Sequence, residues 1–318
     1  MNFTPNYIGR VAPSPTGPLH FGSLVAALAS YLDAKANHGT WLVRMEDVDE
    51  TRCQPEFADE ILRTLTSFGL QWDGEVMVQS QRKLAYEQAL ARLFIGDAEM
   101  GNEKCHAYYC QCSRKEIADS VLTQTPLGVK GLLYPGTCRS RSGGIEHAKT
   151  LHAIRVLTHN QPISFSDQVQ GKRSQQIESE IGDFIIKRRD GLFAYQFAVV
   201  VDDAAQGITN VVRGADLLDS TSRQIFLQQL MGFTTPRYLH IPVIANAAGQ
   251  KLSKQTLAAA VSADSSPATI NSILIQALTL LGQETRLPDI NMPTSRLLQI
   301  AARQWRVEKI PAIYSILP

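Results

Sequence analysis

A histidine at an expected strand–helix junction is the first candidate for chemistry in this sequence. Residues 10–23 read Arg-Val-Ala-Pro-Ser-Pro-Thr-Gly-Pro-Leu-His-Phe-Gly-Ser, between a short apolar run and a segment with helical spacing. His20 precedes the expected helix, whose exposed N–H groups and dipole favour an anion, and Gly22 permits close backbone approach. The segment predicts a phosphate-binding loop. On residue chemistry alone, a proline-rich connector with an incidental histidine is an equal alternative.

Two lysines three residues apart form a second candidate, Lys251-Leu-Ser-Lys254-Gln. Residues at this spacing can converge on one face of a turn, and the compact lysine charge suits a moving phosphate. Taken alone the pattern favours a solvated loop, and it gains meaning only beside the histidine loop.

Clustered cysteines form a third candidate. Of five cysteines, four lie in one short region, as Cys105, Cys110, Cys112 and Cys138. In a chain without secretory features, such clustering favours metal over disulfides, and three thiolates with a fourth ligand fit tetrahedral zinc. Cys105 and His106 compete for the fourth place, and free or buried thiols are the alternative.

The elements expected to position these residues alternate between strands and helices. Residues 7–12, 41–45 and 238–244 are strand candidates, and 153–157, 183–187, 193–201 and 208–213 are strand or short-helix candidates. Helices are expected from about 22, from 55, over 84–95, from a Ser220 cap to 231, from a Ser266 cap to Gly282, and over 294–305. The pattern predicts an α/β fold with a parallel, helix-covered sheet, interrupted by an insertion at about 96–142.

Composition limits the function classes. The 318 residues carry 31 Lys+Arg and 30 Asp+Glu, so the net charge of +1 gives no global nucleic-acid signature, although a local basic face remains compatible with it. No apolar run reaches the roughly 18 residues of a membrane span, and the N-terminus lacks a signal peptide. We therefore expect no membrane partner and a cytoplasmic location. No GxGxxG follows the first strand, which disfavours an NAD-binding Rossmann enzyme.

Together the motifs resemble class I aminoacyl-tRNA synthetases. His20-Phe-Gly-Ser is similar to their HIGH signature, and Lys251-Leu-Ser-Lys-Gln is similar to KMSKS. Other segments resemble the glutamyl branch, in family order: Arg10-Val-Ala-Pro-Ser-Pro-Thr-Gly, Arg44-Met-Glu-Asp-Val-Asp, Tyr195, Val-Val-Asp202-Asp203 and Val-Val-Arg213-Gly-Ala-Asp216. The resemblance implies a class I synthetase Rossmann-type sheet with an inserted zinc-bearing subdomain and a short helical C-terminal tail.

The resemblance also implies a glutamate pocket. Arg10 and Arg213 would bind the substrate carboxylates as planar forks, and Glu46 would bind the ammonium. Ala12 contributes its backbone, and Ser14 and Tyr195 contribute hydroxyl groups. From residue types alone, surface ion pairs of the two arginines, and a Glu46 partnership with Arg44, remain alternatives.

The implied reaction is tRNA-independent adenylation of L-glutamate by ATP, accompanied by Mg²⁺. His20 and Lys254 would be the catalytic residues, and no protein nucleophile is needed. The implied ATP-binding residues are His20, Gly22, Lys251, Ser253 and Lys254, with the adenine near the backbone of 239–243.

For the metal, the family pattern Cys-x-Cys…Tyr-x-x-x-Cys matches Cys110, Cys112, Tyr134 and Cys138. It implies one structural Zn²⁺, because four protein ligands leave no open position. The stretch between Ser113 and Leu133 is longer than the pattern leads us to expect, and we interpret it as a loop insertion.

The resemblance divides the chain into four parts. Residues 1–96 and 191–255 would be the two halves of the catalytic domain, 97–190 the inserted acceptor-type subdomain, and 256–318 a helical stem-contact tail without an anticodon-binding domain. Val199 replaces an asparagine of the full-length glutamyl enzymes, and Gln255 replaces a serine. This combination resembles the glutamyl-Q tRNA(Asp) synthetase family, which transfers glutamate to the queuosine base in the anticodon of tRNA(Asp).

Two other functions stay open on the sequence. One is a shortened glutamyl-tRNA synthetase that charges the 3′ end of tRNA(Glu). The other is a non-catalytic nucleotide-binding regulator, which the intact His20, Glu46, Arg213 and Lys254 disfavour. We expect a monomer. Basic residues for RNA phosphate contacts, or for ordinary solvated surface, are Lys172, Arg173, Lys187, Arg188 and Arg189.

Overall fold

A parallel sheet lies at the centre of the protein. The computed structural model describes residues 6–95, 105–113, 133–139, 152–245, 261–283 and 290–317. One parallel ladder joins β1 (Ile8–Val11), β2 (Thr40–Met45) and β3 (Met77–Val78), and another joins β9 (Asn210–Gly214) to β10 (Arg237–Ile241). The amide of Thr209, just before β9, donates to the Ile8 carbonyl at 2.9 Å, which places β9 beside β1. The expected parallel α/β sheet is confirmed, with strands in the spatial order β3-β2-β1-β9-β10.

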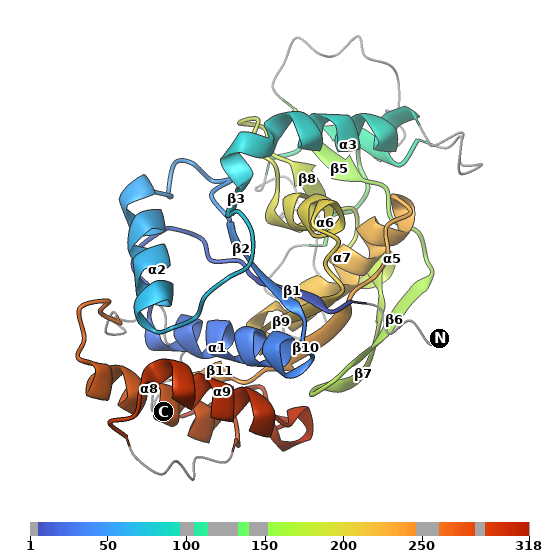
Figure 1. The fold of residues 1–318 in the computed structure, drawn as a ribbon. Helices are drawn as coiled ribbons and strands as arrows, with labels where there is room; N and C mark the ends of the chain where they lie inside the picture. Colours follow the sequence, from blue (N-terminus) through green and yellow to red (C-terminus); the bar gives the residue numbers. More distant parts are fainter. Residues whose placement is uncertain are drawn as a thin grey trace.

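Helices cover this sheet (Figure 1). They are α1 (Phe21–Ala36), α2 (Pro55–Ser67), α3 (Lys83–Ile95), α6 (Tyr195–Ala205), α7 (Leu218–Leu230), α8 (Pro267–Leu280) and α9 (Thr294–Gln304), with the short α5 (Ile177–Glu180). Leu24, Leu28 and Leu32 of α1 are fully buried in one core with Leu274 of α8 and Leu297 of α9. The expected C-terminal helices therefore pack on the first helix of the sheet domain.

Two expected helix starts have different outcomes. The hydroxyl of Ser266 accepts from the Thr269 amide at 3.2 Å, so Ser266 caps α8 as predicted. The prediction for Ser220 is wrong, because α7 begins at Leu218 and Ser220 lies inside it. A 3₁₀ turn over Ala215–Leu217 leads directly into this helix. The ambiguous segment 193–201 is helical from Tyr195.

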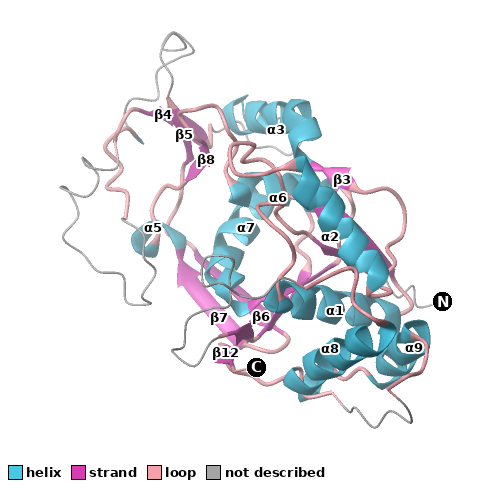
Figure 2. Ribbon diagram, turned by 90° about the vertical axis from the view of Figure 1, so that its left-hand side faces the viewer, coloured by secondary structure: helices cyan, strands magenta, loops and turns pink. Residues whose placement is uncertain are grey.

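The inserted region contributes antiparallel strands. A three-stranded sheet has the order β4 (Ala107–Cys110), β5 (Ala153–Val156), β8 (Ile185–Lys187), and β6 (Pro162–Asp167) pairs with β7 (Gly171–Gln176). Figure 2 shows the three-stranded sheet beside α3, away from α8 and α9. The expected boundaries after residues 96 and 255, and the loop over 114–132, lie outside the described residues, so the domain division stays a prediction.

The end of the chain returns to the sheet domain. Ser315–Ile316 forms β12 and pairs in parallel with β11 (Val243–Ile244). In the part of the chain that the structure describes, no helix has the length and apolar character needed to cross a membrane.

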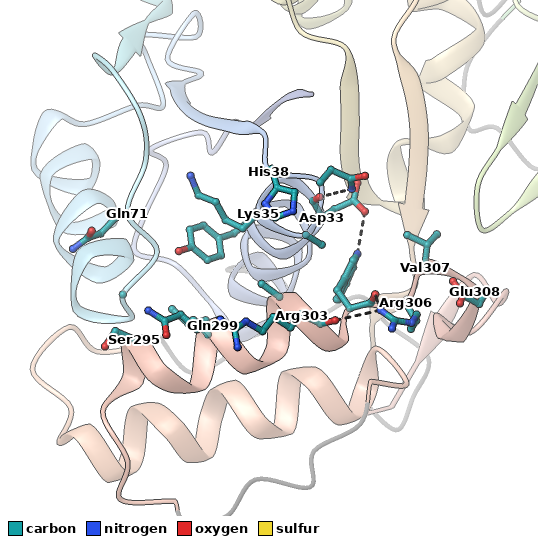
Figure 3. A pocket seen from close by; sticks show the side chains of 17 residues that line it. Asp33, Lys35, His38, Gln71, Ser295, Gln299, Arg303, Arg306, Val307 and Glu308 are labelled. Atoms are coloured by element: carbon teal, nitrogen blue, oxygen red, sulfur yellow. Dashed lines mark hydrogen bonds between the residues drawn. The ribbon is translucent and has the colours of Figure 1, made fainter. Parts of the chain in front are cut away.

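A buried carboxyl group links α1 to the C-terminal helix. Asp33 is 3% exposed and accepts from the Tyr7 hydroxyl at 2.5 Å and from Trp305 Nε1 at 3.0 Å. Figure 3 shows Asp33 with Lys35 and His38 at a cavity of about 850 Å³ between α1 and α9, which these and other residues line. His38 precedes β2, so this cavity lies near the amino ends of the parallel strands.

Trp305→Phe is expected to destabilise the protein by about 1–3 kcal/mol, because it keeps an aromatic ring but leaves a buried carboxyl oxygen without its donor. Chemical denaturation measures the change, with Trp72→Phe, a partly buried tryptophan elsewhere in the same core, as the control. Equal unfolding midpoints for wild type and Trp305→Phe would show that this bond contributes nothing.

Candidate active site

The predicted site residues meet in one cavity of about 420 Å³. It lies at the carboxyl ends of β1, β2, β9 and β10, where the connections from β1 and β9 run in opposite directions. Open α/β sheets bind ligands at this switch point. Every predicted glutamate- or ATP-binding residue that the structure describes lines the cavity: Arg10, Ala12, Ser14, His20, Gly22, Glu46, Tyr195 and Arg213.

Arg10 is held on one wall by a carboxylate from α6. Its Nε and Nη2 lie 3.0 and 3.2 Å from the two oxygens of Asp203, and Nη1 of Arg44 lies 2.8 Å from the same carboxylate. Although burial raises the pKa of Asp203, the two guanidinium groups outweigh it and hold that pKa below its usual range. An ionised Asp203 therefore neutralises part of the charge of this arginine pair and fixes Arg10 in place.

Glu46 follows β2 and faces the same space. Its Oε1 accepts from Arg44 Nη2 at 3.2 Å, and its amide donates to the Pro13 carbonyl at 2.9 Å, which ties it to the histidine loop. Burial raises the pKa of Glu46, and Arg44 and Arg10 oppose that shift. Glu46 thus pairs with Arg44, as the alternative interpretation expected, and it also lines the cavity.

Arg213, near the end of β9, is fixed by three side chains. Its Nε lies 2.9 Å from His240 Nε2, its Nη1 donates to Gln224 Oε1 at 2.8 Å, and its Nη2 donates to Thr221 Oγ1 at 2.8 Å. Arg213 is 6% exposed and Arg10 is 2% exposed. The alternative of surface ion pairs is therefore wrong for both arginines.

Tyr195 begins α6 and lines the cavity together with Glu46. Burial, followed by the nearby Glu46 charge, raises the pKa of its hydroxyl, so the phenol stays protonated and can donate. Val199, one turn along the same helix, is 1% exposed within the core.

His20 occupies the N-cap of α1, directly before the helix as expected. Its Nδ1 accepts from the Ser23 amide at 3.2 Å, and its Nε2 lies 2.9 Å from the Ser23 hydroxyl. Gly22 lies beside the ring, where an added Cβ would come within 3.3 Å of it. The ring therefore stands at a helix N-terminus that opens on the cavity, a position suited to an anion.

The lysine motif lies outside the described residues, so Lys251, Ser253 and Lys254 have no described position. The expected adenine segment does line the cavity, through Ile241, Pro242 and Val243. β12 supports this wall, since the amide of Val243 donates to the Tyr314 carbonyl at 2.9 Å.

Three cysteines form a separate cluster in the inserted region. The sulfurs of Cys110, Cys112 and Cys138 lie within 4.8 Å of one another. The Tyr134 hydroxyl lies 3.5 Å from the Cys110 sulfur and 3.6 Å from the Cys112 sulfur. Cys105, a competing ligand by sequence, lies outside this group, and its thiol donates to the Ala107 carbonyl at 2.9 Å.

The thiols of the cluster have different surroundings. Burial raises the pKa of the Cys112 thiol, and Arg155 Nε donates to the Cys110 sulfur at 3.2 Å. Burial raises the pKa of the Cys138 thiol, but hydrogen bonds from Tyr134 and the Gln111 backbone outweigh it and bring that pKa to about 7. A thiol with a pKa near 7 is readily deprotonated at neutral pH, and thiolates are the ligands that zinc prefers. Three sulfurs and a phenol in one compact group fit a tetrahedral metal site.

Comparison with known proteins assigns the family. The model of the catalytic domain of class I tRNA synthetases (E and Q) matches residues 8–289. A protein from Dechloromonas aromatica named glutamyl-Q tRNA(Asp) synthetase is 50% identical over 305 residues, covering 96% of each chain. A protein of the same name from Thiobacillus denitrificans is also 50% identical over 305 residues, 96% of this chain and 95% of its own. This chain belongs to the glutamyl-Q tRNA(Asp) synthetase family.

A solved structure has the same fold as this protein. The glutamate-tRNA synthetase of Elizabethkingia anophelis superposes with a TM-score of 0.75 at 24% identity, over 98% of this chain and 68% of its own. The protein thus shares the class I synthetase fold with this larger enzyme, as the glutamyl-Q tRNA(Asp) synthetase family assignment requires.

The residues that hold the arginines are poorly marked in the sequence. Asp203 stands there only as part of a motif, and no motif singles out Asp167, His240 or Gln224. Arg10 and Asp203 are 193 positions apart and meet only in the folded sheet, so no local spacing predicts their contact.

Proposed function

We propose that this protein activates L-glutamate with ATP, without tRNA, and transfers the glutamate to the queuosine base in the anticodon of tRNA(Asp). The observation that carries the proposal is the cavity wall on which Arg10 and Arg213 are buried together with Glu46. Glutamate has two carboxylates and one ammonium, and this wall offers two guanidinium groups and one carboxylate. The relatives named glutamyl-Q tRNA(Asp) synthetase, which match almost the whole chain, support the acceptor.

In the proposed activation step, an oxygen of the glutamate α-carboxylate attacks the α-phosphorus of ATP. A new P–O bond forms, the bond to the β-phosphate oxygen breaks, and pyrophosphate leaves with the electron pair. His20, at the α1 N-terminus, would stabilise phosphate charge, and Lys254 would neutralise the departing pyrophosphate. Mg²⁺ accompanying ATP would offset further phosphate charge. The protein contributes position and charge rather than a covalent bond.

Transfer of labelled glutamate to two tRNA pools tests the acceptor. One pool comes from cells that make queuosine and the other from cells that cannot. We expect label only on the first pool, and nuclease digestion should place it in the anticodon fragment. Equal label on both pools, in the 3′-terminal fragment, would instead indicate a shortened glutamyl-tRNA synthetase.

ATP–pyrophosphate exchange without tRNA tests the activation step. Wild-type protein should catalyse glutamate-dependent exchange, and Lys254→Ala should lower kcat by about 100-fold, since it removes a charge that acts in the transition state. Lys309→Ala, an exposed lysine of the C-terminal segment, is the control. Absence of exchange in wild-type protein would favour the non-catalytic alternative.

A further inference from the structure

Two buried residues stand behind Arg213 without lining the cavity. His240 of β10 pairs with Arg213 in the parallel ladder and has no exposed surface, and Asp167 at the end of β6 is 4% exposed. Arg213 Nε lies 2.9 Å from His240 Nε2, and His240 Nδ1 lies 2.6 Å from Asp167 Oδ2. A continuous hydrogen-bonded chain therefore runs from the inserted hairpin to the cavity wall.

The donors and acceptors of this hydrogen-bonded series select one tautomer of His240. A guanidinium only donates, so His240 Nε2 must accept and its proton must be on Nδ1, directed at Asp167. Burial lowers the pKa of His240 to about 4, which keeps the ring neutral near pH 7. A proton on Nε2 would set two N–H groups against each other.

We propose that Asp167 and His240 are positioning residues that hold the Arg213 guanidinium in the orientation that receives a substrate carboxylate. This inference rests on the proposed function, which gives Arg213 its ligand. Gln224 and Thr221 hold the other two nitrogens, so the protein orients the fork before the ligand arrives. Such preorganisation lowers the cost of binding.

Asp167 is anchored by one of its two carboxylate oxygens, so replacing the other oxygen by an NH₂ group tests the inference. Its Oδ1 accepts from the amides of Gln170 at 2.8 Å, Val169 at 3.0 Å and His240 at 3.2 Å. In Asp167→Asn these three donors keep the amide oxygen in the Oδ1 position, so the NH₂ group faces the His240 ring. The ring must then accept at Nδ1 and carry its proton on Nε2, opposite the Arg213 N–H.

The experiment is ATP–pyrophosphate exchange at varied glutamate and varied ATP. Asp167→Asn should raise KM for glutamate at least about tenfold, the size of one charge-assisted hydrogen bond, and leave KM for ATP within about twofold. In ¹⁵N-histidine NMR spectra, the protonated nitrogen of His240 should change from Nδ1 to Nε2. His159→Gln, an exposed histidine that packs on Phe226, is the matched control.

Two further variants separate positioning from folding. His240→Gln can keep an acceptor near the Nε2 position, whereas His240→Asn can keep the donor to Asp167 but loses the acceptor for Arg213. KM for glutamate should therefore rise more in His240→Asn than in His240→Gln. This ranking decides the matter if Asp167→Asn proves unstable.

The outcomes distinguish the two proposals. An unchanged KM for glutamate in a folded Asp167→Asn, or equal values in the two His240 variants, overturns the positioning role and leaves the proposed function intact. Wild-type protein without glutamate-dependent exchange overturns the proposed function itself, and with it the ligand that the positioning role requires.

Discussion

Arg213→Ala is expected to raise KM for glutamate by about 100-fold and to leave KM for ATP nearly unchanged. The guanidinium is buried and fixed by His240, Gln224 and Thr221, so a substrate carboxylate that meets it gains a charge-assisted, oriented hydrogen bond. Loss of one partner of a buried charge pair costs about 2–5 kcal/mol, and each 1.4 kcal/mol changes affinity by about tenfold.

ATP–pyrophosphate exchange measured against glutamate concentration checks this prediction. Arg213→Lys keeps the charge but loses the planar fork, so its KM should lie between those of wild type and Arg213→Ala. Arg237→Ala is the matched control, because Arg237 is exposed at the opposite end of the β9–β10 ladder. An unchanged KM in a folded Arg213→Ala would remove Arg213 from the glutamate pocket.

The part of the site that could be predicted is the part written in local sequence. His20 follows a strand, precedes a helix and needs only those two elements to stand at a helix N-terminus. Glu46 likewise follows an apolar strand that pairs in parallel with the first. The carboxyl ends of parallel strands meet at one edge of the sheet. Residues that directly follow each strand are therefore expected to line one cavity.

The part that could not be predicted depends on contacts between distant segments. The contact of Asp203 with Arg10 carries no local pattern. Neither does the contact of Asp167 with His240, which joins residues 73 positions apart behind Arg213. The error at Ser220 has another cause: serine is a frequent helix cap, but here a 3₁₀ turn already supplies the entry to α7. The capping preference of serine therefore does not decide where this helix begins.

Cys138→Ser is expected to reduce bound zinc from about one ion per chain to a small fraction, and to lower stability by at least about 3 kcal/mol. Binding of a structural metal contributes directly to folding free energy. Among the residues that the structure describes, the apolar neighbours of the cysteines are few: Tyr108, Tyr134, Leu157 and the thiols themselves. Metal analysis by mass spectrometry and thermal unfolding with and without a chelator measure both effects.

Cys105→Ser is the matched control, because Cys105 lies five positions before Cys110 yet outside the sulfur cluster.

Tyr134→Phe then tests the fourth ligand. Its hydroxyl accepts from the Cys138 amide at 2.8 Å, and the Arg155 guanidinium lies 3.8 Å from its ring centre. If the phenol binds zinc, its loss should weaken zinc affinity while packing is retained. Full zinc content in Tyr134→Phe would remove the phenol from the ligand set, and zinc-free protein of full stability would contradict the structural role altogether.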